Sequence, residues 1–172
     1  MSEALGETIR ARWKQPFTVK KIKDGWDSMP SKPGIYIVRS RKAIPRATGV
    51  DRFGTLYVGQ AKNLRNRLWN VWDAQHEATG MLWDHPAVAA KLLRTRFASS
   101  QQRARAVDAL IVRVALPVQP ADLNRAERAV LTAYVQRFGE PPPLNSVFPG
   151  KWSKNRGNRL SRWASRGLTR GV

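Results

Sequence analysis

The alternation of apolar and polar residues along the chain predicts three β-strands. Runs rich in β-branched and aromatic residues occupy 34–40 (GIYIVRS), 55–61 (TLYVGQA) and 107–116 (VDALIVRVAL), and such runs are typical of strands. The intervening segment 41–54 contains one proline and two glycines, which is typical of a loop. The first two strands are therefore expected to pair antiparallel, as a hairpin with a long connection.

Apolar residues recur at helical spacing in three further segments, at 62–75, 85–98 and 120–139. In the last of these, Asp122 is placed to cap the N-terminus and Gly139 follows the final turn. The order strand, strand, helix, helix, strand, helix favours an α+β fold with a small, largely antiparallel, three-stranded sheet flanked by helices.

One domain over 31–148 is expected, with a basic extension at each end, in keeping with the length of 172 residues. Residues 1–30 read as an N-terminal extension that ends in a turn signal, and 149–172 as a C-terminal tail. From Lys151 onward the tail carries seven basic residues and no acidic one. The tail therefore reads as an electrostatic arm that serves affinity more than catalysis.

Charge indicates the class of partner. The chain has 31 Lys and Arg against 12 Asp and Glu, a formal net charge of +19. Such an excess repels itself in a compact state unless a polyanion relieves it, and nucleic acid is the usual polyanion. A ribosome-associated role is an alternative, whereas a membrane-surface role is disfavoured because no long basic amphipathic helix is evident.

Other classes are narrowed by what the sequence lacks. The absence of cysteine excludes disulfides, thiolate nucleophiles and cysteine-based zinc sites. The first residues contain no apolar segment of a signal peptide, and no run approaches the roughly 20 apolar residues of a membrane helix. We therefore expect a cytoplasmic protein without a membrane partner. The sequence does not indicate its oligomeric state.

One carboxylate stands out in the last predicted helix. At 100° per residue, Glu127 projects into the middle of an apolar face. A carboxylate there must be paired, protonated or bound to a cation, because isolated burial is very costly. A structural salt bridge with a buried arginine is an equally good interpretation. The apolar face consists of Leu123, Ala126, Val130, Leu131, Tyr134 and Phe138.

Two arginines in the predicted helix 62–75 differ in their placement. Arg67 lies about 60° from the centre of the apolar stripe, so packing can hold it while its planar guanidinium reaches a neighbouring phosphate. Arg65 is expected to point further out, to solvent. A surface arginine lying over apolar neighbours is the plainer interpretation of Arg67 taken alone.

Two strand segments carry a tyrosine beside a glycine. Gly34 opens the segment that holds Tyr36, and Gly59 closes the segment that holds Tyr57. A tyrosine on a strand most often belongs to the core. Glycine at such places permits close approach of a backbone or a ligand.

These motifs resemble the signature of the GIY-YIG nuclease superfamily. GIY at 34–36 and YVG at 57–59 match its two signature strands, and YVGQAKNLRNRL continues into its first helix with the arginine at Arg67. AERAVLTAYVQRFGEPPPLN resembles its later helix, with the metal-binding glutamate at Glu127 and the final asparagine at Asn145. The likeness covers roughly 30–72 and 121–145, in order, and four ordered elements are far more specific than one triplet.

The resemblance implies a metal-dependent endonuclease that hydrolyses phosphodiester bonds in one cleft. Glu127 would bind Mg²⁺ or Mn²⁺, Arg67 would stabilise the phosphoryl oxygens, and Asn145 would position a neighbouring group or the phosphate. Either Tyr57 or Tyr36 would deprotonate or orient the attacking water. Because the pKa of tyrosine is ordinarily near 10, nearby cations would have to lower it, and Lys62 and Arg65 are the candidate cations.

Two departures from the family pattern bear on the mechanism. The loop between the signature strands is longer than in compact members. Val71, which cannot transfer a proton, stands where many members carry a His or Tyr. His76 is a candidate substitute, although a surface histidine is the better interpretation of it.

Basic residues outside the catalytic set predict the contacts with nucleic acid. Phosphate contacts of this kind give affinity without reading sequence. Trp152 and Trp163 are candidates for stacking on bases, with packing onto the domain as the slightly better interpretation. DNA is the favoured substrate, and a non-catalytic nucleic-acid binder on the same fold is the alternative function. The predicted contact residues are Arg39, Arg41, Lys42, Arg46, Lys62, Arg65, Lys151, Lys154 and Arg156.

Overall fold

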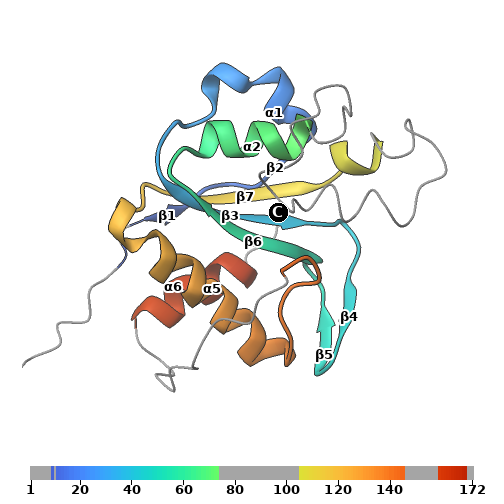
Figure 1. Ribbon diagram of the computed structural model, residues 1–172. Helices are drawn as coiled ribbons and strands as arrows, with labels where there is room; N and C mark the ends of the chain where they lie inside the picture. Colours follow the sequence, from blue (N-terminus) through green and yellow to red (C-terminus); the bar gives the residue numbers. More distant parts are fainter. Residues whose placement is uncertain (1–8, 10, 74–104, 146–158, 170–172) are drawn as a thin grey trace, which may run out of the picture.

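The protein has an α+β fold in which an antiparallel sheet of five strands is packed against helices (Figure 1). The computed structural model describes residues 9, 11–73, 105–145 and 159–169. The strands lie in the order β1-β7-β3-β6, and β2 also pairs with β7. Their bounds are β1 Arg12–Trp13, β2 Phe17–Thr18, β3 Gly34–Arg39, β6 Thr55–Ala61 and β7 Ile111–Leu116.

The three strands predicted from the sequence lie side by side in this sheet, with β6 at one edge. β7 begins only at Ile111, because residues 107 and 108 of the predicted third strand are helical. β3 lies between β6 and β7, with Tyr36 opposite Gly59 on one side and Val114 on the other. Every residue of β3 is buried, which explains why the sequence shows a continuous apolar run there instead of a strict alternation. The sheet is larger than predicted because two short strands extend its β7 edge.

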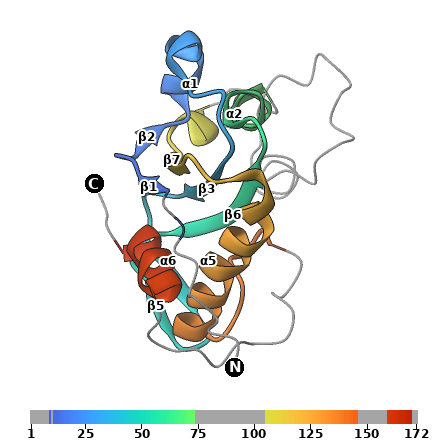
Figure 2. The same ribbon diagram turned by 90° about the vertical axis from the view of Figure 1, so that its left-hand side faces the viewer.

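Helices cover both faces of the sheet (Figures 1 and 2). α1 (Lys20–Asp24) and α2 (Leu64–Asp73) contact each other and enclose a core with Ile22, Leu64 and Leu68. α5 (Leu123–Phe138) and α6 (Arg159–Thr169) pack together on the opposite face. Residues from both of these helices share a second core.

The last predicted helix is confirmed, including its apolar face. All six residues predicted for that face are buried in α5. Gly139 adopts a left-handed φ of 77° and donates its N–H to the Val135 carbonyl at 2.8 Å, which ends the helix as expected. Asp122 stands at the N-cap position as predicted, but its side chain makes no capping hydrogen bond. It ends the short 3-10 turn η4 (Pro120–Asp122) and pairs with Arg125 at 3.5 Å.

The N-terminal segment belongs to the domain, which corrects the expected boundary. β1 and β2 come from residues placed in an extension, and Ile9 and Ala11 are buried in the core beside α5. A 3-10 turn η1 (Trp26–Ser28) follows α1. Two-residue strands are too short to produce a recognisable alternation, so the sequence carried no signal for them.

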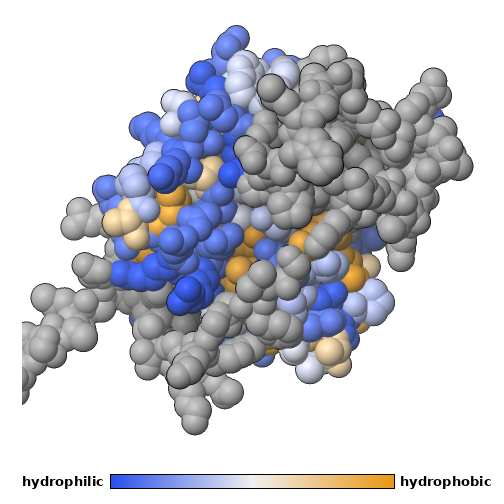
Figure 3. All heavy atoms as spheres, viewed as in Figure 1, coloured by the Kyte–Doolittle hydropathy of each residue, from blue (hydrophilic) through white to orange (hydrophobic). Residues whose placement is uncertain are grey.

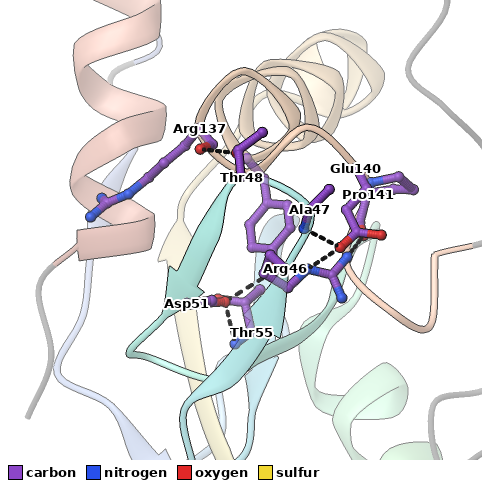
Figure 4. Close-up of polar contacts among 9 residues, drawn as sticks. Arg46, Ala47, Thr48, Asp51, Thr55, Arg137, Glu140 and Pro141 are labelled. Atoms are coloured by element: carbon purple, nitrogen blue, oxygen red, sulfur yellow. Dashed lines mark hydrogen bonds and ion pairs between the residues drawn. The ribbon is translucent and has the colours of Figure 1, made fainter.

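The long loop between the signature strands contains a hairpin, β4 (Ile44–Arg46) and β5 (Gly49–Asp51). The hairpin is fastened to the end of α5 (Figure 4). The Thr48 hydroxyl donates to the Arg137 carbonyl at 3.0 Å, and the Tyr134 hydroxyl donates to Asp51 at 3.1 Å. The connection that looked like a loop is therefore part of the packed structure.

Arg46, predicted to contact nucleic acid, anchors this hairpin instead. Its guanidinium pairs with Glu140 at 3.1 Å, donates to the Pro141 carbonyl and lies 5.7 Å from the centre of the Tyr134 ring. Its side chain is 8% exposed. With its donors directed into the protein, Arg46 is not a surface cation.

The C-terminal segment folds onto the domain as α6, which corrects the prediction of a separate tail. Trp163 stacks on Trp13 with ring centroids 5.2 Å apart. The two indoles exchange hydrogen bonds with opposite segments: Trp163 donates to the Ala11 carbonyl at 2.8 Å and Trp13 to the Trp163 carbonyl at 3.0 Å. Trp163 is thus a core residue, and packing, not base stacking, accounts for it.

Arg39, also predicted to contact nucleic acid, lies under α6. It is 3% exposed and donates to the Gly167 carbonyl at 2.6 Å. Arg113 on β7 donates to the carbonyls of Arg166 and Gly167, both at 3.0 Å. The two arginines satisfy backbone groups that the C-terminal end of a helix leaves without intrahelical partners.

Among the helices that the structure describes, none has the length and apolar character to cross a bilayer. On the face viewed in Figure 3, the described surface is largely hydrophilic.

Several predictions lie outside the described residues: the helix at 85–98, His76, Trp152, Lys151, Lys154 and Arg156.

Replacing Trp163 by alanine tests whether α6 is integral to the fold. Because the indole is buried, stacks on Trp13 and donates to the Ala11 carbonyl, Trp163→Ala should lower the free energy of unfolding by about 3–5 kcal/mol. Arg162→Ala, one residue away and exposed, should change it by no more than about 0.5 kcal/mol. Urea denaturation of both variants measures the contrast, and equal stability of the two would show that α6 is not part of the core.

Candidate active site

Tyr36 and Tyr57 form an aromatic pair across strands β3 and β6. Their ring centroids are 5.8 Å apart. Gly59 lies directly opposite Tyr36 in the sheet, and a Cβ built there would lie 2.7 Å from Cζ of Tyr36 and 2.6 Å from Cε1 of Tyr57. Any larger residue would collide with both rings, so the glycine of the second motif makes the tyrosine pair possible.

The two phenols are coupled, and both stay protonated at neutral pH. A hydrogen bond in which Tyr36 donates to Tyr57 raises the pKa of Tyr36 and lowers that of Tyr57. Burial is the largest influence and raises the pKa of both hydroxyls above the ordinary value of 10.0, while Arg67 lowers both only in part. The expectation that nearby cations lower these pKa values is therefore wrong in its net direction.

The second tyrosine is the one available to a ligand. Tyr36 is 2% exposed, whereas Tyr57 is half-buried. Because Tyr57 accepts the hydrogen bond from Tyr36, its own O–H is not used in the pair and can bond a ligand such as water. Between the two interpretations that the sequence left open, the geometry favours Tyr57 as the residue that meets a substrate.

Arg67 lies on α2 next to this pair. Leu64 and Leu68 are fully buried and hold the helix on the sheet, which leaves the Arg67 side chain half-buried at the edge of the packed stripe. Its positive charge acts on Tyr36, on Tyr57 and on Glu127. Within the described part of the chain, its guanidinium makes no hydrogen bond or ion pair, so its donors remain available.

The start of α2 is fixed by the residues around the first motif. The amides of Leu64 and Arg65 donate to the carbonyls of Lys32 at 3.2 Å and Pro30 at 3.1 Å. A Cβ built on Gly34 would lie 2.5 Å from Cδ1 of Leu64. The glycine of the first motif therefore lets α2 approach β3 closely enough to bring Arg67 to the tyrosines.

Arg65 does not point to solvent as predicted. Its Nε donates to the Met29 carbonyl at 2.8 Å, and a terminal nitrogen donates to the Asp27 carbonyl at 3.0 Å. Its guanidinium lies 5.9 Å from the centre of the Trp26 ring. Arg65 thus ties α2 to η1, and the assignment to nucleic-acid binding is replaced by a structural one.

Glu127 projects from α5 toward the same place. It is half-buried, and Gln60 on β6 donates to its Oε2 at 3.1 Å and also to Asn124. Burial raises the pKa of the carboxyl, which Gln60 and then Arg67 lower in part. No ion pair to Glu127 occurs among the described residues, so the alternative of a structural salt bridge finds no support in that part of the chain.

Gln60 is a site residue that the sequence reasoning missed. Its amide connects β6 to two side chains of α5, Asn124 and Glu127. The available signal was its position: in a strand, the residue after Gly59 points to the face opposite the tyrosines, which is the face that α5 covers. Gln60 therefore orients the carboxylate from behind.

Asn145 belongs to the site through the backbone of β6. Its side-chain amide donates to the Val58 carbonyl at 2.8 Å, and its oxygen accepts from the Val58 amide at 2.9 Å. The Leu144 amide donates to the Leu56 carbonyl at 3.0 Å. Of the two roles expected for Asn145, positioning a neighbour fits, because it holds the free edge of the strand that carries Tyr57 and Gly59.

The remaining predicted basic contacts divide by exposure. Arg41, Lys42 and Lys62 are exposed, in contrast to Arg39, Arg46 and Arg65. Arg128, one residue after Glu127, is also exposed and adds a cation that the sequence reasoning did not single out.

A divalent cation fits this arrangement with one protein ligand. The described residues contain no group of three or more His, Asp or Glu side chains that could hold a metal ion. The half-buried Glu127, with no ion pair in the described residues, suits a Mg²⁺ ion that keeps several waters and gains ligands from a bound phosphate.

Comparison of the chain with protein-family models, with curated proteins and with solved structures finds no match in any of the three. The geometry of the site and the sequence motifs therefore carry the functional argument.

The free-energy cost of burying the Glu127 carboxylate predicts how stability depends on pH. Because the folded-state pKa lies above the ordinary value of 4.5, the folded state loses stability as pH rises from that value through the folded-state pKa. The effect vanishes below the ordinary value. Glu127→Gln keeps an oxygen that accepts from Gln60 but cannot ionise. At about pH 7 it should melt at the same temperature as the parent or a few degrees higher, with the difference disappearing near pH 4. A large drop in melting temperature at about pH 7 would contradict this.

Proposed function

We propose that the protein is a metal-dependent endonuclease that hydrolyses phosphodiester bonds in nucleic acid, with DNA as the favoured substrate. The observation that carries the proposal concerns a cation and an anion, Arg67 and Glu127. Their charges act on each other and on the tyrosine pair, yet neither has an ion-pair partner among the described residues. A scissile phosphate together with a divalent cation would satisfy both groups. The resemblance to the GIY-YIG nucleases supports the same conclusion.

Each side chain has a defined task in this reaction. Arg67 binds the non-bridging phosphate oxygens and stabilises their developing charge. Glu127, oriented by Gln60, supplies the carboxylate for Mg²⁺ or Mn²⁺. When bound, that cation neutralises phosphate charge and lowers the pKa of a coordinated water. Asn145 keeps β6 in register behind Tyr57.

Tyr57 acts as a neutral phenol at physiological pH. Its oxygen accepts a hydrogen bond from the attacking water, while the donor Tyr36 fixes the orientation of the Tyr57 hydroxyl. Because burial raises the pKa of Tyr57, ionisation to a stronger base occurs only at alkaline pH. The rate should therefore continue to rise with pH through the weakly alkaline range.

A non-catalytic nucleic-acid binder is the second candidate function. The raised pKa values of both tyrosines favour it, as does the lack of a group of three or more metal-ligating side chains among the described residues, since a base and a fuller set of metal ligands are common in nucleases. The two candidates differ in one measurable property, which is turnover.

The test uses the full chain with labelled duplex DNA, single-stranded DNA and RNA, each incubated with Mg²⁺, Mn²⁺ or EDTA. The nuclease predicts metal-dependent cleavage by the parent protein and a loss of at least about 10²-fold in Glu127→Gln, with binding retained or strengthened. Binding without cleavage by the parent would establish the second candidate. Equal cleavage by the two proteins would remove Glu127 from the site.

Arg67 and Arg65 offer a matched comparison within one helix. Arg67→Lys keeps the charge but loses the two-pronged donor, so the single-turnover rate should fall by about 10²–10³ with little change in stability. Arg65→Lys loses bonds to backbone carbonyls far from the chemistry, so it should lower the melting temperature but spare the rate of the folded fraction. A slow Arg65→Lys enzyme of normal stability would show that the roles are reversed.

A further inference from the structure

The outer face of α6 carries charge that the fold does not use. Arg162 and Arg166 are exposed, whereas Trp163, Ala164 and Leu168 on the inner face are buried. Nε of Arg166 donates to the Arg162 carbonyl at 3.4 Å, and the two residues lie one turn apart on the same face of the helix. Neither makes an ion pair within the described residues, and like charges one turn apart weaken a helix slightly.

The helix beneath these arginines is held rigidly. A Cβ on Gly167 would lie 2.3 Å from Cζ2 of Trp13, so the backbone of α6 sits directly on that ring. Arg39 and Arg113 bind its C-terminal carbonyls from below. Burial, and then Arg113, lowers the pKa of Arg39 to about 10, so Arg39 stays charged at neutral pH.

The C-terminal end of α6 is thus over-supplied with positive charge. Such an end carries a partial negative charge that one or two cations complement, and the buried arginines already do this. Arg162 and Arg166 add two exposed charges on a pre-organised surface, where little side-chain and backbone freedom remains to be lost on binding an anion.

The distance between the outer face of α6 and the candidate active site sets how long a ligand must be to contact both. α6 lies beside α5, on the α5 side of the sheet (Figure 2). Ala129 and Ala133 pack toward the core shared with α6 and lie about 120–160° around α5 from Glu127. With helix diameters of about 10 Å and packing distances of 8–10 Å, the outer face of α6 is on the order of 20 Å from Glu127.

A polyanion can pass along the described surface between Glu127 and the outer face of α6. Asn124 and Arg128 are exposed on the outer face of α5. Asp122, the described acid at the start of that helix, is paired with Arg125 at 3.5 Å. A strand of nucleic acid leaving the site therefore meets Arg128 first and α6 about six nucleotides later, at 3.4 Å per nucleotide.

We propose that Arg162 and Arg166 on α6 form a second contact for the phosphate backbone, which binds the substrate at a distance from the scissile bond. The proposal rests on the proposed function, since it requires a nucleic-acid substrate. Trp163 faces inward, so no aromatic side chain on the described outer face is placed to stack on bases. We assign the contact to phosphates, which gives affinity and orientation without reading sequence.

The test compares two double variants with equal loss of charge. Arg162→Gln/Arg166→Gln removes the α6 pair, and Lys20→Gln/Lys21→Gln removes two exposed charges from α1 on the opposite side of the sheet. Binding to a fluorescein-labelled 24-base-pair duplex DNA is followed by anisotropy over a salt titration. The α6 variant should bind roughly tenfold more weakly near 0.1 M salt, and its log–log salt slope should fall by about two. The α1 variant should change little, and equal effects of the two variants would overturn the proposal.

Substrate length and charge-retaining changes make the test specific. Arg162→Lys/Arg166→Lys should restore most of the affinity, and all variants should melt within a few degrees of the parent. The defect should disappear on a duplex with about four base pairs beyond the cleavage site and persist with about sixteen; a defect independent of flank length would refute the assignment. Single-turnover cleavage at saturating protein should be unchanged. If the parent binds DNA without cleaving it, the nuclease proposal fails while the comparison of α6 with α1 still decides this one.

Discussion

The pairing of β3 with β6 in the register that places Tyr36 opposite Gly59 is the constraint on which the site depends. The missing side chain at Gly59 lets one aromatic ring cross the neighbouring strand and meet Tyr57. A shift of β6 by one residue against β3 would turn Tyr57 to the opposite face and separate it from Tyr36. Asn145 protects this register from the other side, since its amide copies the bonding of an adjacent strand along Val58.

The site is built from three elements, and the charged side chains that two of them supply do not pair with each other. Arg67 comes from α2, Glu127 from α5 and the phenols from the sheet between them. Gln60 holds the carboxylate with a neutral donor, which orients it but leaves its charge. An arginine at the position of Gln60 would have formed the salt bridge that a purely structural carboxylate calls for. The arrangement costs stability, as the raised pKa of Glu127 shows, and it leaves the charges of Arg67 and Glu127 without an ion pair among the described residues.

Arginines in this protein serve two distinct purposes, and their neighbours decide which. Arg39, Arg46, Arg65 and Arg113 donate to backbone carbonyls and join segments far apart in the chain. The planar guanidinium suits this work because several donors can satisfy several carbonyls at once. Part of the large positive charge is therefore structural, and the charge that remains for a polyanion is concentrated on fewer side chains than the composition suggests.

The sequence alone determined the features that depend on local periodicity. It predicted the three longest strands, the helix α2, the helix α5 with its buried face and its end at Gly139, and the carboxylate of Glu127 among apolar neighbours. These follow from patterns of 2 and 3.6 residues, which a short window contains in full. The same patterns identified Arg67 as a half-packed side chain.

Only the tertiary structure decided which residues of the two terminal segments enter the core and which arginines reach solvent. β1, β2 and α6 depend on partners about 100 to 150 residues away, such as Trp13 with Trp163. Arg65 and Arg67 stand two residues apart, yet Arg65 binds backbone carbonyls and Arg67 faces the tyrosines. Their roles differ because Arg65 lies beside η1 and Arg67 beside the sheet. A long flexible side chain takes its role from whatever lies within its reach, and that neighbourhood is assembled only when the chain has folded.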